Sequence, residues 1–293
     1  MKIKHGVGDR IFTVCNTIIM LFLIVITLYP FWFVVAASFS PAGQVSESMG
    51  LLVWPESIHL DAYEAVLANP NIRSGYINTI FYVLAGTGLN LLFTIVLAYG
   101  LSRKNVRGTS IFMKLITFTM FFSGGMLPTY ILVQKLNLIG TVWSVLLPGL
   151  ISTYNLIILR TSFKTIPASL EEAAKVEGAG EFTIMTKIVI PLSLPTIMIM
   201  VLYYGVAHWN SWFNASLYLT DRNMYPLQLV LREILVVNTL DSMSVGASAQ
   251  DKVSAEQTIK YATIVVATLP ILSVYPFLQK YFVKGMMIGA IKE

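Results

Sequence analysis

The chain has few charged residues for its length. Of its 293 residues, 12% are Asp, Glu, Lys or Arg, against the roughly 25% that is usual in water-soluble domains. Only 15 residues are acidic, while 56% of the chain is hydrophobic. This shortage of charge excludes an ordinary water-soluble domain and indicates a membrane protein.

Cysteine and histidine are also scarce. The single cysteine, Cys15, has no partner within the chain, which excludes an internal disulfide and a thiolate metal site. The three histidines lie in separate segments, and the chain contains no G-x-x-x-x-G-K-[ST] phosphate-binding loop. We therefore expect no enzyme activity, and no metal, ATP or other cofactor bound by this chain itself.

Acidic residues are missing from the long apolar windows of the chain. Carriers driven by protons or ions commonly place Asp or Glu inside the helix bundle as ligands or relays. The lack of such groups weakens the case for a secondary transporter, which remains an alternative function. The Lys and Arg residues form no basic face with interleaved aromatics, so nucleic acid is not an expected partner.

The apolar windows set the expected fold. A helix needs roughly 20 apolar residues to cross a bilayer. Six windows meet or approach this length, at residues 11–39, 76–101, 111–133, 141–159, 193–217 and 262–282. We predict an all-α polytopic membrane protein with six transmembrane helices, forming a single domain over residues 1–293.

The basic residues set the expected orientation in the membrane. Most of the 20 Lys and Arg residues lie near the N-terminus, in the loop 102–108, in the segment 160–192 or near the C-terminus. Because cytoplasmic loops are enriched in Lys and Arg, both termini are expected to be cytoplasmic.

The segment 160–192 is far longer than a connection between two spans requires. It contains "EEAAKVEGAG" at 171–180, a concentration of glutamate in a chain that is otherwise poor in it. Residues 169–175 are good helix formers, Gly178 and Gly180 permit a turn, and a second helix is expected from Phe182. We predict a helix, a turn and a helix, on which a partner protein docks from the cytoplasm.

The same segment resembles the signature of a known family. Its pattern is similar to the EAA signature, E-A-A-x3-G-x9-I-x-L-P, of the membrane subunits of ATP-binding-cassette (ABC) importers. It departs from that signature only at Ile190, where the family has leucine. The matching positions are Glu172, Ala173, Ala174, Gly178, Ile188 and Pro191. Over its whole length the chain resembles the sugar-importer branch, in particular the shorter maltose-type permease subunit and its oligosaccharide and polysaccharide relatives.

The resemblance implies a type I ABC importer permease fold in the bacterial plasma (inner) membrane. The implied partners are a second homologous permease, two ABC ATPases that bind ATP and Mg, and an extracytoplasmic solute-binding protein that delivers a carbohydrate. The signature would form the coupling helix, with Glu172 paired to a basic residue of the ATPase. The outer loop 238–257 would reach the solute-binding protein, and the C-terminal tail would contact the ATPase dimer. A permease for another small solute remains the alternative.

The window 193–217 offers a candidate pathway for the cargo. A sugar needs polar partners for its hydroxyls and a flat surface for its ring faces. Tyr204, His208 and Trp212 recur every four residues on one helix face, and Asn210 and Asn214 lie nearby on another. An aromatic belt at the outer interface with a packed polar network accounts for the same residues. Both interpretations remain open from the sequence.

Overall fold

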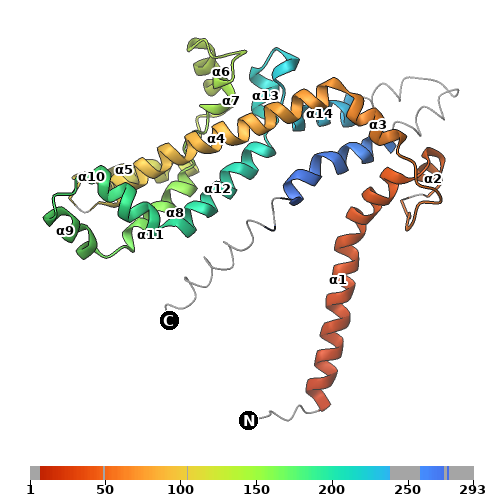
Figure 1. Ribbon diagram of the computed structural model, residues 1–293, viewed down its shortest axis with the longest axis horizontal. Coiled ribbons are helices and arrows are strands. Elements are labelled where there is room, and N and C mark those ends of the chain that lie inside the picture. Colours follow the sequence, from red (N-terminus) through yellow and green to blue (C-terminus); the bar gives the residue numbers. More distant parts are fainter. Residues whose placement is uncertain (1–6, 49, 104, 238–257, 274–275, 277–293) are drawn as a thin grey trace. The chain divides into compact units, whose positions relative to one another are not determined.

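The computed structural model describes residues 7–48, 50–103, 105–237, 258–273 and 276, and all regular elements within these ranges are helical (Figure 1). The chain divides into two compact units. The α1 unit comprises Met1–Pro70 with Leu231–Leu269, and the α4 unit comprises Asn71–Val230 with Pro270–Glu293. The expectation of one domain over residues 1–293 stays a prediction. The outer loop 238–257 and the C-terminal tail lie outside the described residues.

The α1 unit is built on one long apolar helix. Its helices are α1 (Val7–Phe39), α2 (Ala42–Glu47), α3 (Asp61–Ala68), the π-turn η3 (Glu233–Val237) and most of the helix Thr258–Ser273. Near its end α1 buries Ala36 and Ala37 against Val45 and Leu52, with Phe33 packed beside them. Most of α1 is otherwise exposed, as expected for a helix that faces lipid.

The α4 unit contains the remaining helices. In chain order these are α4 (Pro70–Ser102), α5 (Thr109–Phe121), α6 (Met126–Lys135), α7 (Trp143–Leu146), α8 (Thr153–Lys164), α9 (Ala168–Val176), α10 (Glu181–Ile184), the π-turn η1 (Met185–Val189), α11 (Ile190–Leu192), α12 (Leu194–Trp209), α13 (Phe213–Tyr218), the 3₁₀ turn η2 (Arg222–Met224) and α14 (Leu227–Arg232), which extends into the α1 unit.

Two helices have the length and composition to cross a membrane, and they match two of the predicted windows. Among the described residues they are Gly8–Phe39 and Pro70–Ser102, which contain all of the windows 11–39 and 76–101. Two bent pairs raise the number of candidate spans among the described residues to at most four, if each pair is one span. The total of six spans therefore stays a prediction.

Three other windows contain breaks that divide them into separate helices. The window 111–133 is broken at residues 122–125, where Gly125 has a φ of 91° and the two helices meet at 113°. The window 141–159 holds α7 and α8, which are separated by Pro148 and Gly149. The window 193–217 is interrupted after Trp209. Hydropathy counts apolar residues and does not detect the breaks that Gly and Pro make in the first two windows. The third break, at residues 210–212, contains neither Gly nor Pro. Only the first part of the window 262–282 is described, within Thr258–Ser273.

Helix α4 supports the rest of its unit through polar side chains. These occur in pairs four residues apart, and each pair faces one neighbouring segment because residues i and i+4 share a helix face. Asn78 and Tyr82 bond to the carbonyls of residues 223–225. Asn90 and Thr94 bond to the α7–α8 connection and to α12. Tyr99, and Arg103 just beyond the helix, bond to α10 and α9.

Candidate functional site

The segment that follows α8 folds as the sequence predicts, into a helix, a turn and a helix. Helix α9 ends in a left-handed residue, Gly178, with a φ of 84°. The N–H of Gly178 donates to the Lys175 carbonyl at 3.0 Å, and the N–H of Ala179 donates to the Ala174 carbonyl at 2.9 Å. This pair of bonds is a Schellman motif, which satisfies the last carbonyls of the helix and favours glycine at this position. Gly178 thus sets the angle at which the chain leaves α9.

The signature residues on α9 divide between an inner and an outer face. Ala174 packs against the buried cluster that contains Phe163 and Ile184, so its small side chain lets α9 lie close to the unit. Glu172 and Ala173 are exposed. Among the described residues, no hydrogen bond or ion pair engages the Glu172 carboxylate. This acid is therefore open to a partner.

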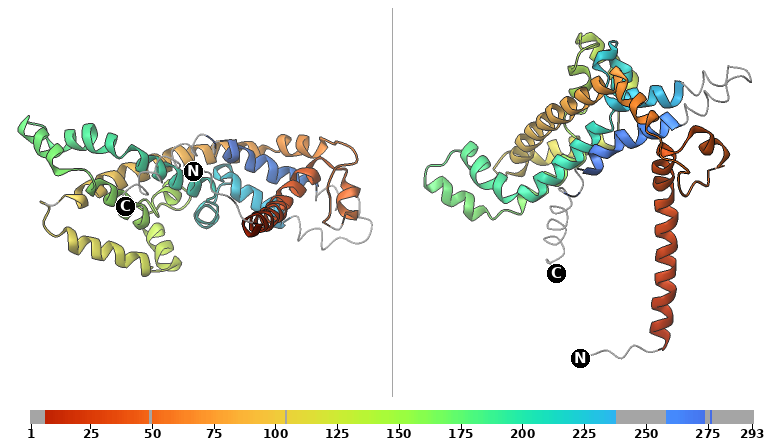
Figure 2. Two further views of the ribbon diagram at one scale, coloured as in Figure 1. Left: turned by 90° about the horizontal axis from the view of Figure 1, so that it is seen from below. Right: turned by 45° about the vertical axis from the view of Figure 1, so that its right-hand side comes forward.

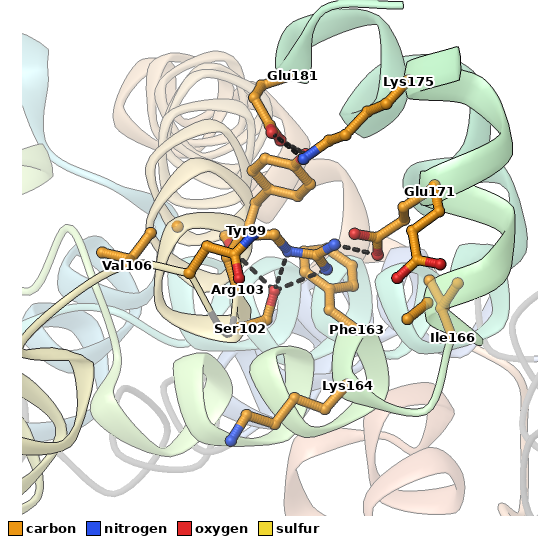
Figure 3. A pocket seen from close by; sticks show the side chains of 14 residues that line it. Tyr99, Ser102, Arg103, Val106, Phe163, Lys164, Ile166, Glu171, Lys175 and Glu181 are labelled. Carbon is orange, nitrogen blue, oxygen red and sulfur yellow. Dashed lines mark hydrogen bonds and ion pairs between the residues drawn. The ribbon is translucent and has the colours of Figure 1, made fainter. Parts of the chain in front are cut away.

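An internal ion pair holds α9 against the end of α4. Arg103, just beyond α4, pairs with Glu171, and the two side chains are only 13% and 16% exposed. The guanidinium also donates to Ser102 Oγ, at 3.0 Å from Nε, and lies 4.5 Å from the centre of the Tyr99 ring. Figure 3 shows Arg103 placed between Tyr99 and Glu171, beside a hollow of about 500 Å³. We call this group the Arg103 brace.

A second set of contacts joins the turn to the same helix. Tyr99 donates to the Glu181 carboxylate at 2.5 Å, and Lys175 Nζ lies 2.6 Å from its other oxygen. The hydrogen bond from Lys175, and then that from Tyr99, lowers the pKa of Glu181 below its usual 4.5. A lowered folded-state pKa contributes stability above the unfolded value, and this contribution is lost as the pH falls below 4.5 through the folded pKa.

The burial of the two ion pairs indicates which of them contributes more to the stability of the α9 attachment. Breaking a buried ion pair by removing one partner costs up to about 3–5 kcal/mol, because the other charge is left uncompensated. Exposed pairs contribute only about 0–1 kcal/mol. The Lys175–Glu181 pair is 44% and 58% exposed, whereas the Arg103–Glu171 pair is nearly covered. The Arg103 brace is therefore the main electrostatic attachment of α9.

The other signature residues lie away from the brace. Ile188 is half-buried in the π-turn η1, while the neighbouring Val189 is fully buried in the core. Pro191 is exposed in α11, just before the chain bends by 83° into α12. These residues connect the docking segment to α12. Their part in contacting an ATPase stays a prediction.

Large apolar side chains are exposed around the open face of this segment. Val176 is 89% exposed, Phe182 is 74% exposed and Leu170 is 44% exposed. Apolar groups beside an unpaired carboxylate are typical of a surface that a partner protein covers. We call Glu172, Val176 and Phe182 the docking face; Leu170 shares the side of α9 that carries Ala174.

Sequence reasoning did not find the Arg103 brace. It identified Glu172 but not Glu171, whose carboxylate is bound within the chain. Tyr99, Arg103 and Glu181 are separated by up to 82 residues, so helix periodicity could not bring them together. The only available signal was an arginine immediately after an apolar window, facing an acidic segment on the same side of the membrane.

Three of the five residues predicted for the pathway line a cavity of about 710 Å³ between α4, α8 and α12. Tyr204, His208 and Asn214 line it. Among the described residues that line it, no Asp, Glu, Lys or Arg is present, and the polar groups are amides, hydroxyls and one imidazole. A neutral lining of this kind suits a hydroxyl-rich solute.

A hydrogen-bonded network forms one wall of this cavity. Asn90 Nδ2 donates to the carbonyl of Leu150 at 2.6 Å, and Asn90 Oδ1 lies 2.6 Å from His208 Nε2. Since Oδ1 is an acceptor, Nε2 carries the hydrogen in this pair. The Tyr204 hydroxyl accepts from the Ser152 N–H at 3.2 Å and bonds with Thr94. The network satisfies backbone groups that the break between α7 and α8 leaves unpaired.

Trp212 and Asn210 do not line this cavity. Trp212 packs against the cluster that contains Val145 and Leu219, and the Asn210 amide donates to the Val206 carbonyl at 3.0 Å. The exposed rings near the cavity are instead Tyr154 and Tyr203, whose centres are 6.3 Å apart. A role for Trp212 in stacking on the cargo stays a prediction that the packing does not favour.

Long apolar helices and a neutral polar cavity together define a membrane protein with room for a polar solute. No family model matches the chain. The chain is 41% identical over 285 residues to Protein LplC of Bacillus subtilis (strain 168), across 97% of this chain and 96% of that protein. It is 40% identical over 284 residues to the polygalacturonan/rhamnogalacturonan transport system permease protein YtcP of the same organism, across 97% and 99% of the two chains.

A solved structure agrees with these relatives. A chain of a bacterial ABC transporter involved in the import of the acidic polysaccharide alginate has a TM-score of 0.86 and 31% identity, across 96% of this chain and 100% of that chain. The present chain therefore belongs to the permease subunits of carbohydrate ABC importers. Such subunits are transport proteins of the membrane rather than enzymes.

Gly86→Ala tests the network around the cavity. A methyl carbon at Gly86 would lie 2.5 Å from the His208 ring, so the ring must move away from Asn90. We expect a lower unfolding temperature of the purified complex, since overpacking costs about 1–3 kcal/mol. In Gly88→Ala, the matched control on α4, the new methyl meets no atom within 4 Å. Equal unfolding temperatures of the two variants would contradict the network.

Arg103→Ala tests the brace. Hydrogen exchange of the α9 amides, measured in the assembled protein, should accelerate a hundredfold or more if the loss is about 3 kcal/mol. Lys164→Ala is the matched control, because Lys164 lines the same hollow and is exposed. Unchanged exchange in Arg103→Ala would show that apolar packing alone holds α9.

Proposed function

We propose that this chain is the permease subunit that forms half of the translocation pathway of an ATP-driven oligosaccharide importer. It pairs with a second homologous permease, and each permease rests on one of two ABC ATPases that bind ATP and Mg. An extracytoplasmic solute-binding protein delivers the cargo. Both chain termini face the cytoplasm of a bacterial cell, with the spans in its plasma membrane.

The main support for this proposal is that two adjacent glutamates have different environments. Glu171 is paired with Arg103 inside the chain, while Glu172 is exposed on the docking face. A loop that only connected two spans would not need one acid held inward and the next presented outward. The arrangement supports a helix fixed rigidly to α4, so that movement of a partner is transmitted to the cavity side of the unit.

The cavity and the relatives support an oligosaccharide as the cargo. One of the relatives, YtcP, is named for polygalacturonan/rhamnogalacturonan transport, and the solved importer is described as importing alginate. The described cavity offers neutral hydrogen-bonding groups and two tyrosine rings, which suit sugar hydroxyls and sugar faces. A different small solute is the second candidate, and competition for uptake between oligosaccharides and unrelated solutes distinguishes the two.

Glu172→Gln tests the coupling role. In vesicles that contain the complete importer, we expect slower ATP-dependent uptake and weaker stimulation of ATP hydrolysis by the loaded binding protein. An ion pair covered by the ATPase would account for up to about 3–5 kcal/mol of docking energy. Glu177→Gln is the matched control, because it removes an equal charge from the same segment at a variable position of the signature. Full uptake by Glu172→Gln would exclude the proposed contact.

Gly178→Val tests whether the turn angle matters. A left-handed backbone costs a branched residue at least about 1–2 kcal/mol, whereas Asn tolerates it better. No atom lies within 4 Å of a side-chain carbon at this position, so any effect arises from the backbone. We expect Gly178→Val to reduce uptake at normal membrane abundance, and Gly178→Asn to retain most of it. Similar uptake by both variants would argue against a fixed turn.

A further inference from the structure

The connection between α2 and α3 presents apolar side chains outward. Leu51 is 77% exposed, Val53 is 69% exposed and Trp54 is 66% exposed, while Leu52 between them is 3% exposed. Leu52 packs with Ala36 and Ala37 of α1. One side chain therefore attaches this segment to the unit, and its neighbours form an unpartnered apolar surface. We call residues 50–54 the α1 loop.

The α1 loop is bonded directly to the side of α1. The Tyr29 hydroxyl donates to the Gly50 carbonyl at 2.9 Å, and Trp32 Nε1 donates to the Val53 carbonyl at 2.7 Å. The rings of Trp32 and Trp54 have centres 5.7 Å apart. Figures 1 and 2 show the chain between α2 and α3 lying beside the end of α1.

These bonds place the α1 loop beside residues that precede the C-terminal end of α1. Tyr29 and Trp32 precede the last residue, Phe39, by about 15 Å and 10 Å along the axis, at 1.5 Å per residue. The chain then returns to the helix end, where the His59 N–H donates to the Phe39 carbonyl at 2.9 Å. The α1 loop thus lies beside the last turns of α1, at the level of Tyr29 and Trp32, and the chain then returns to the level of Phe39.

The depth of the α1 loop relative to the membrane follows from the charges of α1. Arg10 is the last charged residue before the apolar run, so it marks one edge of the hydrocarbon. A span of about 20 residues then places Pro30 at the opposite edge. A tilt of about 20° adds only about one residue to this count. Tyr29 and Trp32 therefore lie at the far interface, and the loop bonded to them lies at the same depth.

We propose that the α1 loop is a membrane anchor, with Leu51, Val53 and Trp54 inserted into the interfacial layer of the leaflet where α1 emerges. Trp54 and Trp32 form the local aromatic belt, the position that tryptophan favours in membranes. The anchor fixes the depth and rotation of α1. This inference requires only that α1 spans the membrane, and it is independent of the cargo and of the ATPase contact.

The bilayer is favoured as the occupant because the surface continues the lipid-facing side of α1. The apolar window of α1 has no buried residue among those described. Residues 48–55 carry no charge, and the acids that flank this stretch are Glu47, at the end of α2, and Glu56. Gln44 accepts from the Glu56 N–H at 3.0 Å and donates to the Trp54 carbonyl at 3.1 Å, so backbone groups on the return path are paired. Pairing of this kind is required of backbone near lipid.

Spin labels test the anchor in the complete importer reconstituted in lipid vesicles. The label is placed at Val53→Cys in a Cys15→Ser background, which removes the only native cysteine. Glu64→Cys, on the exposed side of α3, is the control. Relaxation by lipid-soluble oxygen is compared with relaxation by a water-soluble nickel chelate. We expect oxygen to dominate at Val53 and the nickel chelate to dominate at Glu64.

Three outcomes would overturn the proposal. Dominant relaxation by the nickel chelate at Val53 would place the loop in water. Protection from both reagents in the importer alone would place it against another subunit. Protection that develops only when the solute-binding protein is added would make the loop a docking surface for that protein.

Discussion

The backbone groups that helix breaks leave unpaired must find partners, because lipid supplies none. Helix α4 meets this constraint for its unit. Its side chains bond to carbonyls in the breaks before α8 and near η2, and its C-terminal end holds α9. The structure can therefore interrupt the windows that would otherwise be plain spans, and use the interruptions to line a cavity. Helix α4 thus supplies hydrogen-bond partners for several irregular segments.

The same helix links the cavity wall to the segment that contains α9. Asn90 and Thr94 bond to His208 and Tyr204 of the cavity wall, and Tyr99 and Arg103 bond to α10 and α9, about two and a half turns further along. A rigid helix transmits displacement between its ends without a chain of small adjustments. The Arg103 brace and the hydrogen-bonded network of the cavity are thus both attached to α4. This arrangement explains why a nearly covered ion pair, rather than an exposed one, joins α9 to α4.

In the α1 unit, side-chain hydrogen bonds to backbone carbonyls serve to fix the depth of α1 in the membrane. An apolar helix in lipid has little that fixes its depth, apart from charges at one end and aromatic residues at the other. Tyr29 and Trp32 serve both as interfacial residues and as hydrogen-bond donors to the chain beside them. The polar tips of these rings hold the loop, while their apolar bodies face the same surroundings as the helix. Such double use suits tyrosine and tryptophan, which have one apolar and one polar end.

The sequence by itself determined the membrane class, the helical fold and the helix, turn and helix that follow α8, since charge content, apolar length and the spacing from Glu172 to Pro191 are local properties. It also indicated Tyr204 and His208, which line the cavity. Only the tertiary structure decided where the windows break, that Glu171 rather than Glu172 is bound to Arg103, and that Trp212 packs in a core. These features depend on contacts between residues far apart in the chain, and on backbone angles at Gly and Pro that periodicity does not report.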